Sequence, residues 1–280
     1  MENIIISNPS KLDEIKEKIS KQGKDKFHVI VDFDRTLTKC FFKGEKSPTV
    51  IAQIREGNYL TPDYASKAHD LFDKYYPIEI NPKISLKEKK EKMTEWWKAH
   101  FNLLVECGMN KKVINEITKK SKIKFRKGVL EFLSFLKKRN IPIVIMSAGP
   151  GDMIEEHLKQ ENIFYNNINI IGNRFEFDGD GKVIKIKEPI IHAFNKSETS
   201  VKELEIYDQL LKRKNVLLLG DTIGDAGMIE GFPYENLIKI GFLNINAEEN
   251  LEEFKKNYDV LILNDDDFDY VNELVNEIVE

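Results

Sequence analysis

The sequence predicts an α/β fold in which helices cover both faces of a parallel, doubly wound sheet, with an all-helical cap domain inserted into it. Two observations lead to this prediction. From residue 124 onward, apolar β-branched runs alternate with helical patterns, as in parallel strands joined by crossover helices. Residues 48–123, in contrast, contain helical patterns and no convincing strand. We therefore expect residues 1–47 and 124–280 to form the core and residues 48–123 to form the cap.

The first part of the core is expected to hold one helix and one buried strand. Asn8 or Ser10 can cap a helix over residues 11–21. The run HVIVD that follows is mostly apolar and β-branched, which suits a buried parallel strand, and it stops on two carboxylates, Asp32 and Asp34. Two acids at the carboxyl end of a strand lie where open α/β sheets bind ligands. The alternative is that they solvate the strand end and begin a turn.

The cap is expected to consist of three long helices. Ser85 and Glu88 form the pattern of a capping box, which marks the start of the second helix. Pro77 and Pro82 separate the first helix from the second. The expected helices cover residues 64–76, 85–106 and 110–120.

In the second part of the core, strands and helices alternate. Asp152 is expected to cap the helix that follows the first strand of this part. Residues 174–187 alternate around the turn sequence DGDG, which predicts a hairpin; a calcium loop would need a later bidentate glutamate. The expected strands cover residues 141–146, 168–171, 216–221, 237–242 and 260–263. The expected helices cover residues 129–139, 151–160 and 198–212, a segment between the last two strands, and residues 268–280.

Composition excludes several functions. The chain has 280 residues and a net charge of −4, with a pI near 5.9, which argues against nucleic acid or an anionic membrane as the main partner. Its two cysteines lack metal-like spacing and are expected to be free thiols. No apolar run approaches the roughly 20 residues of a membrane span, and the N-terminus does not read as a signal peptide. We expect a cytoplasmic monomer.

Charge is distributed unevenly along the chain. Residues 111–127 hold eight basic residues and one acid, whereas residues 248–280 hold twelve acids and two lysines. Both stretches are expected to be solvated faces, and the alternative for the basic run is a weak docking patch for anions. Nucleic-acid binding by this run is disfavoured by the acidic pI and by the lack of interleaved aromatic residues.

Acidic side chains follow two of the expected strands. Asp32 and Asp34 follow the first, and Asp221 follows a later one, with Asp225 four residues on. Because the carboxyl ends of parallel strands meet at one edge, these acids are expected to lie together. Two unit charges about 4 Å apart repel by about 4 kcal/mol at an effective dielectric of about 20. A cation must therefore share the site, and an all-oxygen ligand set suits Mg²⁺.

Two further residues complete a candidate phosphate site. Ser147 follows the strand over residues 141–146, and Lys196, in HAFNKSE, can supply the positive charge that a bound phosphate needs. Each residue also has an ordinary structural interpretation. Ser147 can be a plain loop residue, Asp225 a helix N-cap, and Lys196 one of many surface lysines. The joint order of these residues at strand ends favours the site.

The motifs DFDRTLT, SAG and GDTIGD, in this order with a lysine before the last, resemble the haloacid dehalogenase superfamily of phosphohydrolases. Over nearly the whole chain the sequence resembles its cytosolic 5′-nucleotidase III family, the nucleotidases of pyrimidine and 7-methylguanosine monophosphates. The segments that carry this resemblance are NPSKLDEIKEKI, YYPIEI, EWWKAH, SAGPGDMIEEHL, HAFNKSE, NVLLLGDTIGD and LIKIGFLN. The resemblance implies a Rossmann-like core with a helical cap.

The resemblance also implies the role of each residue in the phosphate chemistry. Asp32 would be the nucleophile that forms an aspartyl phosphate, and Asp34 would protonate the leaving ribose oxygen and then activate water. Ser147, the backbone of Ala148 and Lys196 would hold the phosphoryl oxygens. Mg²⁺ would be bound by the Asp32 carboxylate, the Asp34 carbonyl and Asp221, with Asp225 supporting. The implied activity is Mg²⁺-dependent hydrolysis of nucleoside 5′-monophosphates to nucleoside and phosphate.

Base recognition is implied to lie in the cap. Glu79 matches the position at which the family contacts the base, and Trp97 or its neighbour Trp96 could stack on it, although both could equally be core residues. The sequence departs from the family at Arg35, where relatives usually carry an uncharged residue. It departs again where some relatives contact the base or ribose through a serine, a position taken here by Ala99 or His100.

Two other functions compete with this interpretation. A phosphatase for another small phosphate ester would use the same core with a different cap. A receiver-type regulatory domain also uses an aspartate, Mg²⁺, a hydroxyl and a lysine. In receivers, however, the paired acids precede the phosphorylated one, and the chain is about half as long. The order found here therefore disfavours a receiver.

Overall fold

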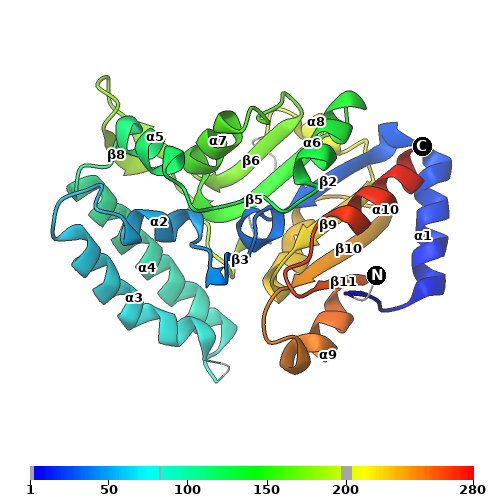
Figure 1. Cartoon of the computed structure of the whole chain (residues 1–280), viewed down its shortest axis with the longest axis horizontal. Helices are drawn as coiled ribbons and strands as arrows, with labels where there is room; N and C mark the ends of the chain where they lie inside the picture. The colour runs from blue at the N-terminus through cyan, green and yellow to red at the C-terminus, as the bar shows by residue number, and fades with distance from the viewer. Residues whose placement is uncertain (1–2, 82, 197–203) are drawn as a thin grey trace.

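The computed structural model describes residues 3–81, 83–196 and 204–280, and its centre is a seven-stranded sheet (Figure 1). The strands follow the spatial order β1-β11-β10-β9-β2-β5-β6, and all neighbours are parallel except β1 against β11. The predicted doubly wound sheet is thus confirmed. The strands are β1 (Ile4–Ile6), β2 (Phe27–Val31), β5 (Ile143–Pro150), β6 (Ile168–Asn173), β9 (Asn215–Gly220), β10 (Asn236–Leu243) and β11 (Val260–Leu263).

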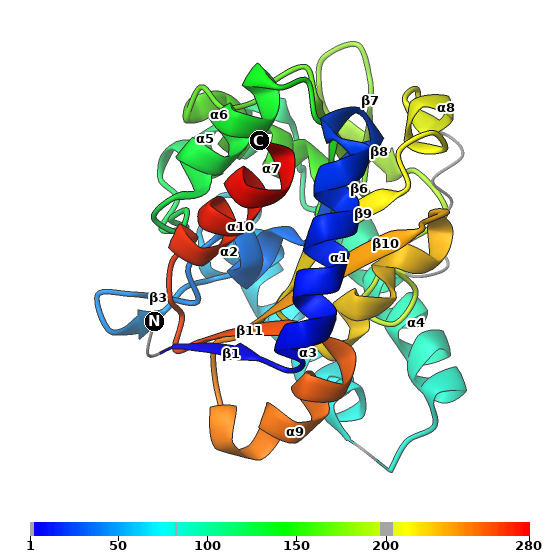
Figure 2. The same ribbon diagram turned by 90° about the vertical axis from the view of Figure 1, so that its right-hand side faces the viewer.

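Side chains alternate between two apolar layers, one on each face of the sheet. Val29 and Val31 enter one layer, while Ile30 between them enters the other. Figure 2 shows α1 and α10 in front of the sheet, on the side of the first layer. This layer is covered by α1 (Pro9–Gln22), α6 (Val129–Lys138), α7 (Gly151–Gln160) and α10 (Asp269–Val279). The second layer is covered by α8 (Tyr207–Leu210), the 3-10 helix η4 (Ile223–Gly231) and α9 (Ala247–Asn257).

The strand order reverses beside β2. From β2 the chain proceeds outward through β5 to β6, and it then returns to β9 on the other side of β2 before continuing to β10 and β11. The carboxyl ends of β2, β5 and β9 therefore converge at a topological switch point, which is where open α/β sheets bind ligands.

The inserted segment is helical and includes α2 (Val50–Glu56), α3 (Tyr64–Ile80), α4 (Leu86–Glu106) and α5 (Lys111–Lys119). α3 and α4 pack side by side and project away from the sheet (Figure 1). α5 packs along α7 of the core, and α4 contacts β8 (Val183–Ile186), which pairs with β7 (Phe175–Phe177) in the predicted hairpin. The insertion is thus fastened to the core at α2, α4 and α5.

Four short elements in the first 56 residues lack a sequence signal. β1 is a three-residue antiparallel edge strand, and β3 (Phe41–Phe42) pairs with β4 (Glu45–Lys46) in a small hairpin. α2 has seven residues, and Thr49 caps it by accepting from the Ala52 N–H. Elements this short do not establish a periodicity, so sequence patterns do not predict them.

The expected end of the first cap helix at Tyr76 is wrong. α3 continues through Pro77 to Ile80. Proline cannot donate a hydrogen bond to the carbonyl four residues earlier, which belongs to Asp73. Pro77 and Asp73 are both exposed, so water can satisfy that carbonyl. Pro82 lies outside the described residues.

Two other sequence predictions need correction. Asp152 does not cap α7: Pro150 occupies the N-cap position, and Asp152 accepts from the Phe175 N–H instead. In the part of 198–212 that the structure describes, only α8 is α-helical, and residues 198–203 lie outside that part. Leu204, Ile206 and Tyr207 pack against the second apolar layer, where tertiary packing outweighs helix propensity. Within the described segments, no helix is both long and apolar enough to cross a membrane.

Candidate active site

The carboxyl end of β2 turns sharply, and this turn presents Asp32 and Asp34. Arg35 adopts a left-handed conformation with φ of 62°, and its N–H donates to Thr38 Oγ1 at 2.8 Å. The Asp34 carboxylate accepts from the Val50 N–H at 3.0 Å, at the start of α2. The turn is therefore bonded both to itself and to the beginning of the insertion.

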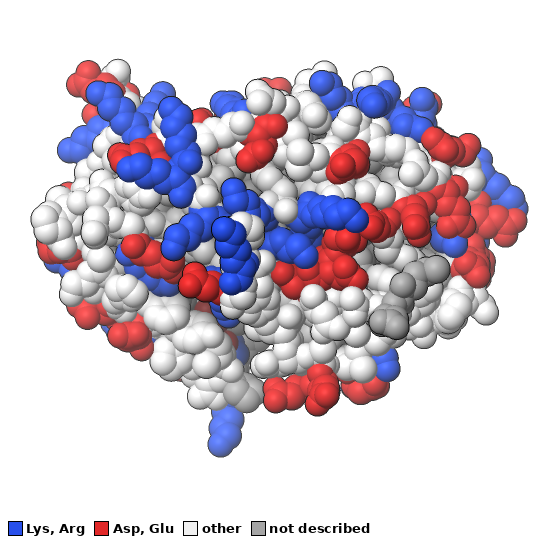
Figure 3. Space-filling view, viewed as in Figure 1, with Lys and Arg blue, Asp and Glu red and all other residues white. Residues whose placement is uncertain are grey.

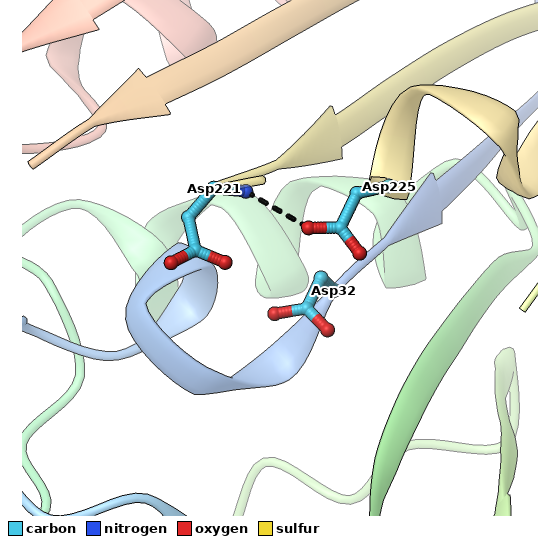
Figure 4. A group of neighbouring side chains, drawn as sticks. All are labelled: Asp32, Asp221 and Asp225. Carbon is cyan, nitrogen blue, oxygen red and sulfur yellow. Dashed lines mark hydrogen bonds between the residues drawn. The ribbon is translucent and has the colours of Figure 1, made fainter. Parts of the chain in front are cut away.

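Three carboxylates from two strand ends form one cluster. Ligand oxygens of Asp32, Asp221 and Asp225 lie within 4.8 Å of one another, and Figure 4 shows the three groups facing a common centre. Asp225 also accepts from the N–H groups of Asp221 and Thr222, at 3.2 and 3.0 Å. It closes a capping box with Thr222, which is the N-cap residue of η4. Asp225 thus serves both the helix start and the acid cluster.

Lys196 neutralises part of this cluster. Its ammonium group forms ion pairs with Asp32 and, at 2.7 Å, with Asp225. The lysine is only 7% exposed, so it is not the surface residue of the alternative interpretation. Three carboxylates and one ammonium leave two negative charges at the centre of the site. An oxygen-rich centre with this residual charge fits a divalent cation such as Mg²⁺.

Burial raises the pKa of three acids of the site, Asp32, Asp34 and Asp221. Burial, followed by the charges of Asp32 and Asp225, holds the pKa of Asp221 well above its ordinary value. Burial also raises the pKa of Asp32, while Lys196 opposes this rise. Burial raises the pKa of Asp34 to about 6, against the Val50 N–H. A carboxyl group with such a pKa can exchange a proton near neutral pH.

A cavity of about 190 Å³ joins the acids to residues of the insertion. It brings together the residues predicted for phosphate chemistry and metal binding, and two of the candidate base contacts, Glu79 and Trp97. Its lining consists of Asp32, Asp34, Arg35, Thr49, Ile51, Glu79, Trp97, Ser147, Ala148, Gly149, Ala193, Lys196, Asp221, Thr222 and Asp225. The metal, phosphate and base regions predicted from the sequence are thus continuous in space.

Residues 147–149, at the carboxyl end of β5, line the cavity beside the acids. Ser147 is buried, and its hydroxyl accepts from the Gly149 N–H at 3.0 Å. The Ala148 carbonyl accepts from the Asn173 side chain at 2.6 Å. Hydroxyl and backbone donors of this kind are suited to phosphoryl oxygens.

Glu79 and Trp97 enter the cavity from α3 and α4. Burial raises the pKa of Glu79, and Lys89, whose ammonium donates to the Glu79 carbonyl at 2.7 Å, opposes this rise. Trp97 packs against Phe101 with ring centroids 5.4 Å apart. These two side chains supply one acceptor and one aromatic surface to the cavity wall.

Three candidate base contacts do not line this cavity. Trp96 stacks on Tyr75 within the cap, with ring centroids 6.0 Å apart and nearly parallel planes. Ala99 lines a separate groove between α3 and α4. His100 is buried against Tyr64, and the two share a hydrogen bond of 2.9 Å. Of the alternatives left open by the sequence, Trp97 is the tryptophan at the site.

Sequence analysis missed Thr49 and Ile51 as cavity residues, and it missed Arg126 as a buried residue that donates to the turn after Asp34. Thr49 and Ile51 follow a small hairpin that has no sequence signal. Arg126 belongs to the basic run 111–127, where composition does not distinguish it from seven solvated cations. The sequence alone therefore does not indicate which cation of this lysine-rich stretch is buried.

The fold is haloacid dehalogenase-like. Solved structures with this fold include a haloacid dehalogenase-family hydrolase from Salmonella enterica, with a TM-score of 0.56 at 16% identity. A phospho-aspartyl intermediate analogue of phosphoserine phosphatase matches with a TM-score of 0.53 at 17% identity. These two likenesses concern the fold.

The chain belongs to the pyrimidine 5′-nucleotidase (UMPH-1) family, whose model matches residues 35–279. It is 37% identical over 272 residues to the 7-methylguanosine phosphate-specific 5′-nucleotidase A of Xenopus laevis, covering 97% of this chain and 94% of that one. The human 7-methylguanosine phosphate-specific 5′-nucleotidase is 35% identical over 277 residues, covering 99% and 92%. A crystal structure of cytosolic 5′-nucleotidase IIIB bound to cytidine has a TM-score of 0.90 at 27% identity, covering 99% and 93%. The chain is therefore an enzyme of the 5′-nucleotidase type.

Proposed function

We propose that the protein is a Mg²⁺-dependent 5′-nucleotidase that hydrolyses pyrimidine nucleoside monophosphates such as CMP and UMP, or 7-methylguanosine monophosphate, through an aspartyl phosphate. The observation that supports this most strongly is the single cavity that holds two acids of one strand end, a buried lysine and two cap residues. Relatives of the chain bear the names of both substrate classes.

In the first half of the proposed reaction, an Asp32 carboxylate oxygen attacks phosphorus, and the bond from phosphorus to the ribose 5′-oxygen breaks. Asp34 donates its proton to that oxygen, so the nucleoside leaves as an alcohol. In the second half, Asp34 takes a proton from water, whose oxygen attacks phosphorus. Phosphate leaves, and the Asp32 carboxylate is restored. The raised pKa of Asp34 supports this alternation between acid and base.

Ser147, the Ala148 backbone and Lys196 hold the phosphoryl oxygens in this proposal. Mg²⁺ is held by the Asp32 carboxylate, the Asp34 carbonyl and Asp221, with Asp225 supporting. When bound, the ion neutralises charge on the carboxylates and on the phosphoryl group. The close approach of Asp32, Asp221 and Asp225 supports this ligand set.

Glu79 and Trp97 are proposed to recognise the base. A carboxylate can accept hydrogen bonds from an exocyclic amine, as carboxylates do from cytosine in DNA. An indole ring can stack on a base and attracts a cationic one more strongly. We also propose that the protein acts in the cytoplasm as a monomer, a state that size-exclusion chromatography with light scattering tests.

A phosphate-release screen tests the function. Purified protein with Mg²⁺ is assayed against the common nucleoside monophosphates, 7-methylguanosine monophosphate and p-nitrophenyl phosphate. We expect CMP, UMP or 7-methylguanosine monophosphate to give the highest kcat/KM. The alternative, a phosphatase of another small phosphate ester, predicts that nucleotides are cleaved no better than p-nitrophenyl phosphate. Absence of turnover on every substrate would contradict the enzyme proposal.

A further inference from the structure

Arg126 is a buried cation, and all three nitrogens of its guanidinium group bond to acceptors in one region of the core. It is 1% exposed and forms an ion pair with Asp265 at 2.9 Å. The remaining N–H groups donate to the Asn244 side chain and to the backbone carbonyls of Arg35, Thr36 and Asp266. Guanidinium has five N–H donors, and five acceptors surround this one.

Two of these acceptors belong to the turn that carries Asp34. Arg126 Nε donates to the Thr36 carbonyl at 2.8 Å, and Nη2 donates to the Arg35 carbonyl. The Asn244 amide also donates to the Arg35 carbonyl, at 3.0 Å. Two consecutive peptide groups after Asp34 are thus held by side chains from elsewhere in the fold.

The peptide group between Asp34 and Arg35 is held from its other side. Its N–H, on Arg35, donates to Thr38 Oγ1 at 2.8 Å. A trans peptide is planar, with N–H and C=O on opposite sides, so this bond also fixes the direction of the Asp34 carbonyl. Arg35 has φ of 62°, a left-handed conformation that is unfavourable for a residue other than glycine. The bonds from Arg126, Asn244 and Thr38 offset this cost.

We propose that Arg126 is a positioning residue: through the Arg35 and Thr36 carbonyls it holds the turn in the shape that aims the Asp34 carbonyl at the metal, and so sets the affinity for Mg²⁺. This inference rests on the proposed function, in which that carbonyl is a metal ligand. Arg126 touches neither substrate nor metal. Its effect passes through the backbone that it anchors.

The test measures Mg²⁺ binding by calorimetry on the substrate-free protein, beside kcat and KM for p-nitrophenyl phosphate. Arg126→Lys keeps the charge but loses the forked donors, and we expect the Kd for Mg²⁺ to rise by about tenfold, the lower end of losses seen when groups behind metal ligands are removed. Saturating Mg²⁺ should restore most of kcat with little change in KM. Lys127→Met is the matched control. Lys127 is the exposed cation next to Arg126 in the sequence, and among the described residues it forms ion pairs only with Asp267 and Asp269.

Thr38→Val covers the case in which Arg126 variants fail to fold. It removes the hydroxyl that holds the Arg35 N–H and preserves side-chain shape, and it should also raise the Kd for Mg²⁺ several-fold. A wild-type Kd in folded Arg126→Lys or Thr38→Val, even with lower activity, would overturn the inference. Failure of the proposed function would appear differently, as wild-type protein that binds Mg²⁺ but releases no phosphate from nucleotides.

Discussion

The core side and the cap side of the cavity are built from different interactions. On the core side, three of the four acids are fixed by polar partners: Asp32 by Lys196, Asp225 by the Thr222 capping box, and Asp34 by the Val50 N–H. On the cap side, Trp97 packs among aromatic rings, and Glu79 lies on the last turn of a helix. Fixed charges suit a reaction that is the same for every substrate, whereas an aromatic wall can change with the base. We therefore expect substitutions on the core side to affect all substrates, and substitutions on the cap side to affect them selectively.

The largest effect should come from the nucleophile on the core side. Asp32→Asn should lower kcat by at least about 10³-fold for nucleotides and for p-nitrophenyl phosphate alike, since only binding and electrostatic contributions would remain. Beryllium fluoride should label the wild-type protein and not the variant. The melting temperature serves as the control for folding. Full activity of Asp32→Asn would exclude a covalent intermediate on this residue.

The next largest effect should come from the metal site. EDTA should abolish turnover, and added Mg²⁺ should restore it. Asp221→Ala should raise the Mg²⁺ concentration for half-maximal activity more than Asp225→Asn does. The Asp225 oxygens already accept hydrogen bonds from Lys196 and from backbone N–H groups, so Asp225 is less available to the metal. Titrations of activity against Mg²⁺ measure both. Hydrolysis by metal-free wild-type protein would contradict the site.

A smaller and selective effect should come from Glu79. Glu79→Ala should lower kcat/KM for nucleotides. The loss should correspond to roughly 1–3 kcal/mol of transition-state stabilisation, the scale of one hydrogen bond to a charged group. It should leave p-nitrophenyl phosphate, which has no base, nearly unchanged. Glu79→Gln keeps an acceptor oxygen and should lose less. If both substrates slow equally, the difference between core and cap does not hold at this residue.

Variants of the two tryptophans test the cap side of the cavity further, because only Trp97 lines it. Trp97→Leu should lower kcat/KM for 7-methylguanosine monophosphate more than kcat/KM for CMP, because the methylated base is cationic and an aromatic ring attracts a cation. Trp96→Leu should mainly lower the melting temperature, because Trp96 stacks inside the cap. Steady-state kinetics and thermal melts on the two variants distinguish these effects. A base-selective effect of Trp96→Leu would contradict the assignment of Trp97.

The smallest effect should come from a basic surface outside the cavity. Figure 3 shows Lys and Arg side chains gathered across the middle of one face. Lys43 and Lys46 are exposed on the β3–β4 hairpin, which leads to Thr49 in the cavity wall. Lys43→Gln with Lys46→Gln should lower kcat/KM for nucleotides by about twofold to threefold at low salt, and the effect should vanish near 0.5 M salt. Lys212→Gln, at an exposed lysine beyond α8, is the control.

The core side of the site could be predicted from strand patterns. Asp32, Asp34 and Asp221 follow buried strands, and the edge of a parallel sheet brings such residues together. Lys196 and Glu79 lie on a loop and a helix that give no local signal. The charge that a bound phosphate needs made Lys196 a candidate, while its role and the place of Glu79 came from the resemblance to a family. Arg126 stayed hidden because burial of a cation depends on partners remote in sequence, such as Asn244 and Asp265.

The chain enters and leaves the insertion through two segments that are paired beside the catalytic turn. Thr38 bridges Phe125, the Lys39 N–H donates to the Lys124 carbonyl, and the Arg126 N–H donates to the Leu37 carbonyl. α2 is also bonded to Asp34, α5 packs on α7, and α4 contacts β8 of the core. Because the pairing at the boundary of the inserted segment joins the turn that presents Asp32 and Asp34, this boundary is not suited to be a hinge. The geometry around Asp32 and Asp34 is then set once, when the chain folds, and is not rebuilt in every catalytic cycle.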